Sequence, residues 1–102
     1  MRKIINGKMY DTEKAECLGS YDNGHCRNNI NFYEEELYKT KKGNYFIYEN
    51  GGSNSKCSIY IGGNYMGGSN IYAVSEEKAR KWAEKYLGTD DYIRIFGEIE
   101  EA

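Results

Sequence analysis

Three cysteines and one histidine are the side chains of this chain best suited to bind a metal ion, and they are Cys17, His25, Cys26 and Cys57. Three thiolates and one imidazole form the ligand set of a closed tetrahedral zinc site, which is structural because no position stays open to water. The spacing departs from the common zinc-finger pattern, since His25 and Cys26 are neighbours and no C-x-x-C pair occurs. The sequence therefore predicts a structural Zn²⁺, with ligands from the loop around residues 20–26 and from a later strand.

Two simpler roles for the cysteines stay open. Buried free cysteine behaves as a small hydrophobic residue and needs no metal. A disulfide between Cys17 and Cys26 would leave Cys57 unpaired, and nothing in the sequence indicates an oxidising compartment.

Length and composition indicate one small domain, residues 1–102. Eleven tyrosines and an aromatic content of 15% disfavour disorder and favour a β-sheet over a helix bundle. The net charge of −2 argues against a general nucleic-acid binder, which would carry a basic face. No signal peptide and no stretch of about 20 apolar residues is present, so we expect a cytoplasmic protein with no membrane partner.

The elements expected before residue 50 are two hairpins and a short helix. Asn6-Gly7, between apolar pairs, predicts a two-residue hairpin turn over residues 4–10. A cap at Asp11 or Thr12 predicts a short helix over residues 13–18, ended by Gly19. A second hairpin is expected to join residues 32–40 to residues 45–48 through a Lys-Lys-Gly-Asn turn.

The later half of the chain is expected to contain short strands and one long helix. Residues 56–61, 70–74 and 91–96 are predicted strands, and Gly-Gly-Ser-Asn, which occurs at 51–54 and again at 67–70, is interpreted as a turn used twice. Ser75 is expected to cap a helix over residues 76–87 that has a single apolar face around Trp82. The predicted fold class is α+β: an antiparallel twisted sheet, with one long C-terminal helix (76–87) and one short N-terminal helix packed on it.

Two acidic segments are candidate partner-binding surfaces. Glu34, Glu35 and Glu36 are expected to make their strand an edge or a half-exposed strand. The second segment lies at the C-terminal end and contains Asp90, Asp91, Glu98 and Glu100. Acidic side chains of this kind could lie against a basic surface of a partner.

Three segments, which together cover about half of the chain, carry a resemblance to a known family. They are Ile4-Ile5-Asn6-Gly7-Lys8-Met9-Tyr10-Asp11-Thr12, Leu37-Tyr38-Lys39-Thr40-Lys41-Lys42-Gly43-Asn44-Tyr45-Phe46, and Ser75-Glu76-Glu77 with Ala79, Trp82, Ala83 and Glu84. The chain resembles small proteins of phages and mobile elements, several of which are anti-CRISPR proteins against type II-A Cas9. The resemblance implies a stoichiometric, non-enzymatic inhibitor that binds Cas9 or its guide-RNA complex in the cytoplasm of an infected bacterial host. Such an inhibitor would block target-DNA loading or cleavage.

Other functions stay open at this stage. The chain could be a phage-encoded interaction module that acts on another host factor. It could also be a small zinc-stabilised nucleic-acid-binding protein, with Lys39, Lys41, Lys42 and Lys56 as its basic patch, although we expect no direct sequence-specific binding to nucleic acid. An enzyme is disfavoured, because a single histidine next to a cysteine gives no catalytic triad and no paired-carboxylate motif stands out.

Overall fold

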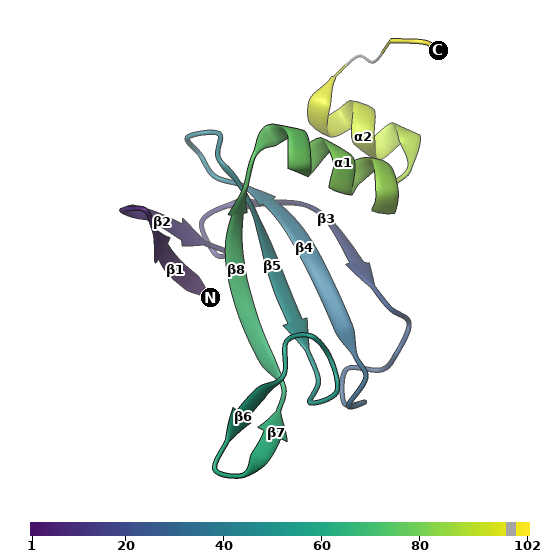
Figure 1. Cartoon of the computed structure of the whole chain (residues 1–102). Coiled ribbons are helices and arrows are strands. Elements are labelled where there is room, and N and C mark those ends of the chain that lie inside the picture. The colour runs from purple at the N-terminus through teal and green to yellow at the C-terminus, as the bar shows by residue number, and fades with distance from the viewer. Residues whose placement is uncertain (98–99) are drawn as a thin grey trace.

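The structure is a computed structural model that describes residues 1–97 and 100–102 (Figure 1). The described residues form eight strands and two helices. The strands are β1 (Arg2–Ile5), β2 (Lys8–Asp11), β3 (Glu16–Asp22), β4 (Tyr33–Lys39), β5 (Tyr45–Gly51), β6 (Ile59–Ile61), β7 (Asn64–Met66) and β8 (Gly68–Val74), and the helices are α1 (Glu76–Tyr86) and α2 (Thr89–Phe96).

A four-stranded antiparallel sheet in the order β3-β4-β5-β8 forms the centre of the molecule. The hairpins β1–β2 and β6–β7 are separate two-stranded ribbons. Helices α1 and α2 cover one end of one face of the sheet, and the β6–β7 hairpin projects from the opposite end (Figure 1). Strand β4 lies between β3 and β5, so the expectation that the strand with Glu34–Glu36 is an edge is wrong.

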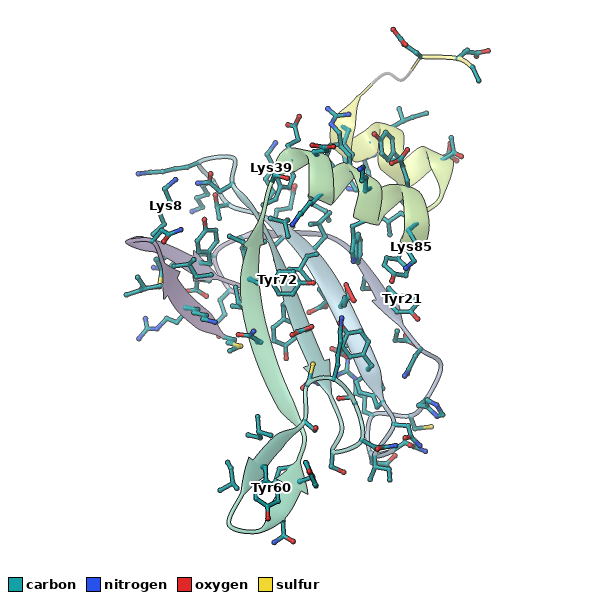
Figure 2. The ribbon with its side chains drawn as sticks, in the orientation of Figure 1. Lys8, Tyr21, Lys39, Tyr60, Tyr72 and Lys85 are labelled. Carbon is teal, nitrogen blue, oxygen red and sulfur yellow. The ribbon has the colours of Figure 1, made fainter. Side chains whose placement is uncertain are left out.

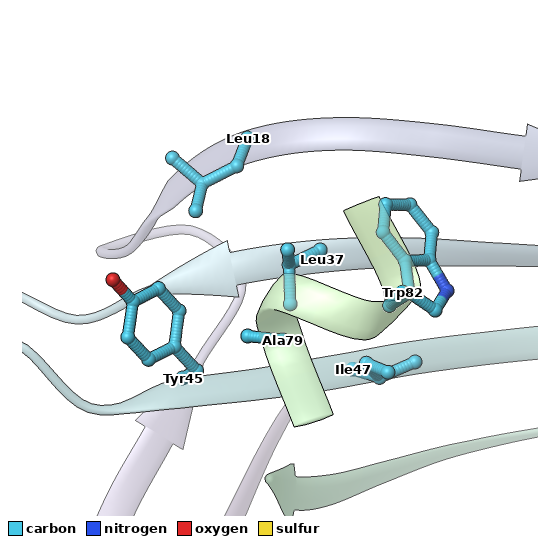
Figure 3. Close-up of a cluster of buried hydrophobic side chains, with 6 residues drawn as sticks. All are labelled: Leu18, Leu37, Tyr45, Ile47, Ala79 and Trp82. Atoms are coloured by element: carbon cyan, nitrogen blue, oxygen red, sulfur yellow. The ribbon is translucent and has the colours of Figure 1, made fainter. Parts of the chain in front are cut away.

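The face of the sheet under the helices holds the larger core. Side chains alternate between the two faces of a strand, so residues two apart, such as Tyr45 and Ile47, reach the same side. This core contains Leu18, Leu37, Tyr45, Ile47, Ala79 and Trp82 (Figure 3). It joins β3, β4 and β5 to helix α1, and therefore holds the helix on the sheet.

The β1–β2 hairpin contributes to the core on the other face. Asn6 and Gly7 have φ angles of 51° and 77°, as a two-residue turn with left-handed residues requires. The turn places Tyr10 against the sheet, where its ring meets Phe46 edge-on at a centroid distance of 5.4 Å. Tyr38 stacks on the same ring at 5.0 Å. The predicted turn at Asn6-Gly7 is thus confirmed, and it serves to cover this second face.

The predicted helix over residues 13–18 and the predicted strand over residues 91–96 are both wrong, and the fold class is corrected accordingly. Residues 13–18 form no helix: a turn closed by the amides of Lys14 and Ala15 on the Asp11 carbonyl leads directly into β3. Strand β3 buries Leu18 in the core and pairs with β4, and this long-range pairing outweighs the local helix preference. At the other end, residues 91–96 belong to helix α2 and form no strand.

Among the described residues, the C-terminal part therefore consists of two short helices in place of one long helix, and no N-terminal helix packs on the sheet. Helix α1 begins where Ser75 accepts a hydrogen bond from the Lys78 amide at 3.2 Å, which confirms the predicted cap. The Leu87 amide closes it on the Ala83 carbonyl, and the chain turns at Gly88 into α2.

The two Gly-Gly-Ser-Asn segments meet each other at the base of the β6–β7 hairpin. Gly51, the last residue of β5, pairs with Gly68, the first residue of β8. A Cβ atom at Gly67 would lie 2.6 Å from the Gly51 carbonyl oxygen, and one at Gly52 would lie 2.5 Å from that of Ile30. Backbone therefore packs directly on backbone here, which requires the glycines. The expected turn is present in the first segment, where the Ser55 amide donates to the Gly52 carbonyl, whereas the second segment lies mostly in β8 and is not a turn.

Candidate functional site

The four predicted zinc ligands lie in three separate parts of the molecule. Cys17 is exposed at the beginning of β3, where its thiol donates to the Gly19 carbonyl at 3.8 Å. His25 and Cys26 are exposed in the loop that follows β3. Cys17 is five residues from the end of this strand, and five residues of strand span about 16 Å, so the loop begins far from Cys17. Cys57 is buried in the loop that follows β5.

The described residues contain no group of three or more His, Cys, Asp or Glu side chains arranged to hold a metal ion. The donor set on which the zinc prediction depends is therefore not gathered into a site. Burial raises the pKa of the Cys57 thiol from 9.0 to about 11. Cys17 is an exposed residue, but partial desolvation of its thiol and the nearby charge of Glu36 also raise its pKa. Both changes favour the neutral thiol over the thiolate that binds metal. The geometry thus fits the alternative in which the cysteines are free thiols.

The first predicted acidic surface is largely buried. Glu34 and Glu35 are 7% and 5% exposed, and Glu36 is half-buried and accepts a hydrogen bond from the Tyr38 hydroxyl at 3.3 Å. Glu34 lies 3.0 Å from the Arg27 guanidinium; burial raises the pKa of this carboxyl, and Arg27 partly opposes the rise. Each of these carboxylates has partners within the fold, so the three glutamates do not form an open acidic face.

The second predicted acidic surface remains exposed where the structure describes it. Asp90 and Asp91 lie in the first turn of α2, and Asp91 is 3.5 Å from the Arg94 guanidinium. Glu100 is also exposed, whereas Glu98 lies outside the described residues. A candidate acidic contact surface is therefore restricted to α2 and the segment after it.

A hydrogen-bonded network around Glu35 connects helix α1 to the sheet. The Trp82 indole donates to one carboxylate oxygen of Glu35 at 2.9 Å, and the Tyr33 hydroxyl lies 2.7 Å from the other. The same hydroxyl is 3.0 Å from a carboxylate oxygen of Glu49, the residue that pairs with Glu35 across β4 and β5. Lys56 is 3.7 Å and 3.8 Å from these two carboxylates.

This network has the chemistry of a structural support. Burial and hydrogen bonds to the two carboxylates raise the pKa of Tyr33, so its hydroxyl stays protonated. The Lys56 ammonium lies 4.7 Å from the centre of the Tyr33 ring and balances part of the paired negative charge. Glu49 was not among the predicted site residues, although the hairpin turn at residues 40–44 fixes the register that places Glu49 opposite the like charge of Glu35.

Exposed large apolar side chains are concentrated on the β6–β7 hairpin. All six of its strand residues are exposed, and five of them are apolar or aromatic. Their exposed fractions are 46% for Ile59, 64% for Tyr60, 57% for Ile61, 69% for Tyr65 and 50% for Met66. Figure 2 shows Tyr60 on the ribbon that projects beyond the sheet.

A tight turn and a cross-strand pair of tyrosines define the shape of this exposed hairpin. The turn uses Gly62 and Gly63, whose φ angles of 58° and 85° suit a two-residue hairpin turn. Tyr60 and Tyr65 face each other across the ribbon with a centroid distance of 5.0 Å. An isolated hairpin of this length is only marginally stable in water, so the apolar side chains are not explained by the stability of the free hairpin.

Comparisons of the chain with protein-family models, with curated proteins and with solved structures find no match. No helix in the part of the chain described here has both the length and the apolar character needed to cross a membrane.

Proposed function

We propose that the chain is a protein-binding inhibitor of type II-A Cas9 that acts stoichiometrically, and that the β6–β7 hairpin is its main contact surface. The observation that carries the proposal is the set of five exposed apolar side chains on this projecting hairpin, with Tyr60 and Tyr65 on one face of the ribbon and Ile59, Ile61 and Met66 on the other. Tyrosine and methionine are enriched in protein interfaces, and apolar side chains on both faces of one exposed ribbon differ from apolar residues scattered singly over a surface.

The size of the hairpin is sufficient for a specific contact. Burying one large apolar side chain contributes about 1.5–3 kcal/mol, so two or three of the five residues could supply the central energy of an interface. The hairpin also projects from the sheet, so it could enter a cleft of a partner without displacing the core (Figure 1). These properties support a binding protein whose scaffold presents one rigid ribbon.

Cas9 is proposed as the partner on the strength of the resemblance in the three segments of the sequence. Cas9 holds its guide–target duplex in a positively charged channel. Asp90, Asp91 and Glu100 are exposed and supply acidic side chains that could lie near such a channel. Binding of the inhibitor would then oppose the loading of target DNA, and its association would weaken as the salt concentration rises.

A Cas9 cleavage assay with matched substitutions tests the proposal. Tyr60→Ala and Ile61→Ala are expected to weaken both binding and inhibition by tenfold or more, because a central apolar contact is worth about 1.4 kcal/mol or more. Ile4→Ala is the matched control, since Ile4 is 66% exposed on the other hairpin. Full cleavage by several type II-A Cas9 proteins at an excess of inhibitor would overturn the choice of target. Equal effects of Ile4→Ala and Ile61→Ala would overturn the choice of surface.

A further inference from the structure

A basic cavity lies between the β1–β2 hairpin and the turn that joins β4 to β5. Its volume is about 510 Å³, within the range of about 300–1,000 Å³ typical of small-molecule sites. Four lysines line it: Lys8, Lys14, Lys41 and Lys42. An adjoining hollow shares Lys14 and Lys41 and adds Lys39 and the carboxylate of Glu16. Figure 2 shows Lys8 and Lys39 at this end of the molecule, away from the β6–β7 hairpin.

The charge of the cavity is unbalanced. Four lysine charges against the single carboxylate of Asp11 leave +3 in the lining, although the whole chain has a net charge of −2. Asp11 already accepts a hydrogen bond from the Glu13 amide at 2.9 Å. Within residues 1–97 and 100–102, the ion pairs formed involve other basic residues and none of these four lysines. Four exposed lysines therefore line one hollow, and none of them forms an ion pair with a carboxylate of the described residues.

Short turns fix the positions of the segments that carry these lysines. The Thr40 side chain accepts from the Asn44 amide at 3.0 Å, and its carbonyl accepts from the Gly43 amide at 2.9 Å, which sets the Lys41-Lys42 turn. Lys14 lies in the turn closed on the Asp11 carbonyl. The main chain of the cavity wall is thus ordered, whereas each ammonium group can adjust on its flexible stem.

The floor of the cavity favours recognition by charge over recognition by stacking. Tyr10 is only 6% exposed, and its ring packs edge-on against Phe46. Its face is therefore not free to stack on a nucleobase, as aromatic platforms for single-stranded nucleic acid do. Lysine ammonium groups bind phosphate oxygens as point charges and do so without selecting a base sequence.

We propose that Lys8, Lys14, Lys41 and Lys42 form a phosphate-binding site for a nucleotide ligand, either free or as part of a single-stranded nucleic acid. Binding uses the phosphate groups and is independent of base sequence. The site lies apart from the β6–β7 hairpin, so it does not depend on the proposed action on Cas9, and either proposal can fail alone.

Fluorescence anisotropy with a labelled oligothymidylate and calorimetry with ATP test this site in the full chain at low salt. The double substitution K41E/K42E is expected to weaken binding by about tenfold or more, because each lost phosphate contact also removes its share of counterion release. K41R/K42R should keep the affinity, since it keeps the charge. K78E is the matched control, because Lys78 is exposed on α1 and does not line the cavity.

The outcomes separate the two sources of phosphate. Tight binding of the oligonucleotide with weak binding of ATP assigns the site to a nucleic-acid backbone, whereas ATP binding that displaces the oligonucleotide assigns it to a free nucleotide. The proposal is overturned if neither ligand binds at low salt, or if K78E weakens binding as much as K41E/K42E does. Circular dichroism checks that each variant is folded.

Discussion

The indole nitrogen of Trp82 lies 2.9 Å from a carboxylate oxygen of Glu35, 47 positions earlier in the chain. The contact joins helix α1 to the second strand of the central sheet, with both side chains buried. The glutamate run in β4 is therefore tied to the helix face that the sequence places in the core.

Replacing Trp82 should destabilise the fold in two distinguishable steps. Trp82→Phe removes the indole donor and leaves a buried carboxylate oxygen without it, which should cost about 1–3 kcal/mol. Trp82→Ala also empties the core volume and should cost about 3–5 kcal/mol. Urea unfolding gives both values, and Lys56→Met, at the exposed edge of the same network, should cost under about 1 kcal/mol. Equal losses for Trp82→Phe and Lys56→Met would contradict a buried role for the indole.

Gly52→Ala is expected to destabilise the protein by about 1–3 kcal/mol, because the added methyl group would press on the backbone carbonyl of Ile30 and the structure would have to shift. Gly88→Ala is the matched control, since a methyl group there meets no atom within 4 Å among the described residues and Gly88 has a φ of −77°. Thermal melting of the two variants checks the difference. A Gly52→Ala protein as stable as Gly88→Ala would show that the two loops do not pack as closely as described.

Alkaline pH should destabilise the wild-type protein partly through Cys57. Burial raises the pKa of this thiol from 9.0 to about 11, so the folded state keeps a proton that the unfolded chain has lost. The stabilisation is therefore complete below about pH 9 and decreases as the pH rises through about 11. Urea unfolding at several pH values should show a smaller alkaline loss for Cys57→Ala than for wild type. Tyrosine ionisation affects both proteins and cancels in the difference; parallel curves would contradict the assigned burial.

Chelation of metal should leave the melting temperature unchanged, because the four predicted ligands do not converge in the described structure. Elemental analysis of protein purified without added metal is the direct measurement. One zinc ion per chain, together with a lower melting temperature after chelation, would instead show that the loops bearing Cys26 and Cys57 rearrange around a metal. Cys26→Ser serves as the control, because an exposed free thiol should tolerate this change.

The parts of the fold that the sequence predicted well are those fixed by neighbouring residues. Asn6-Gly7 determines its turn through backbone conformation alone, and the Ser75 cap depends on an amide three residues later. Residues 13–18 show the limit of such signals, because their helix-like composition was outweighed by the pairing of β3 with β4.

Short apolar runs leave strand and helix difficult to separate. Tyr92, Ile93, Ile95 and Phe96 are aromatic and β-branched residues in a short run, as in a strand, but Tyr92 and Phe96 also stand one helical turn apart, and their rings lie 5.0 Å from each other in α2. The side chains that surround a charged residue in the fold could not be predicted from the sequence either. Glu35 was expected at the surface, because a run of three glutamates gives no sign of buried partners. Trp82, Tyr33 and Lys56 come close to it only in the folded chain.

The glycine contacts at the base of the β6–β7 hairpin bear on the entropy of any association that uses it. Gly51 and Gly68 pair as the last and first residues of β5 and β8. Strand β7 continues through Gly67 into β8, whereas the loop of residues 52–58 lies between β5 and β6. Close backbone packing at Gly52 and Gly67 leaves little room for the ribbon to swing. A partner would therefore meet side chains whose main chain is already ordered, and little of the binding free energy would be spent on ordering it.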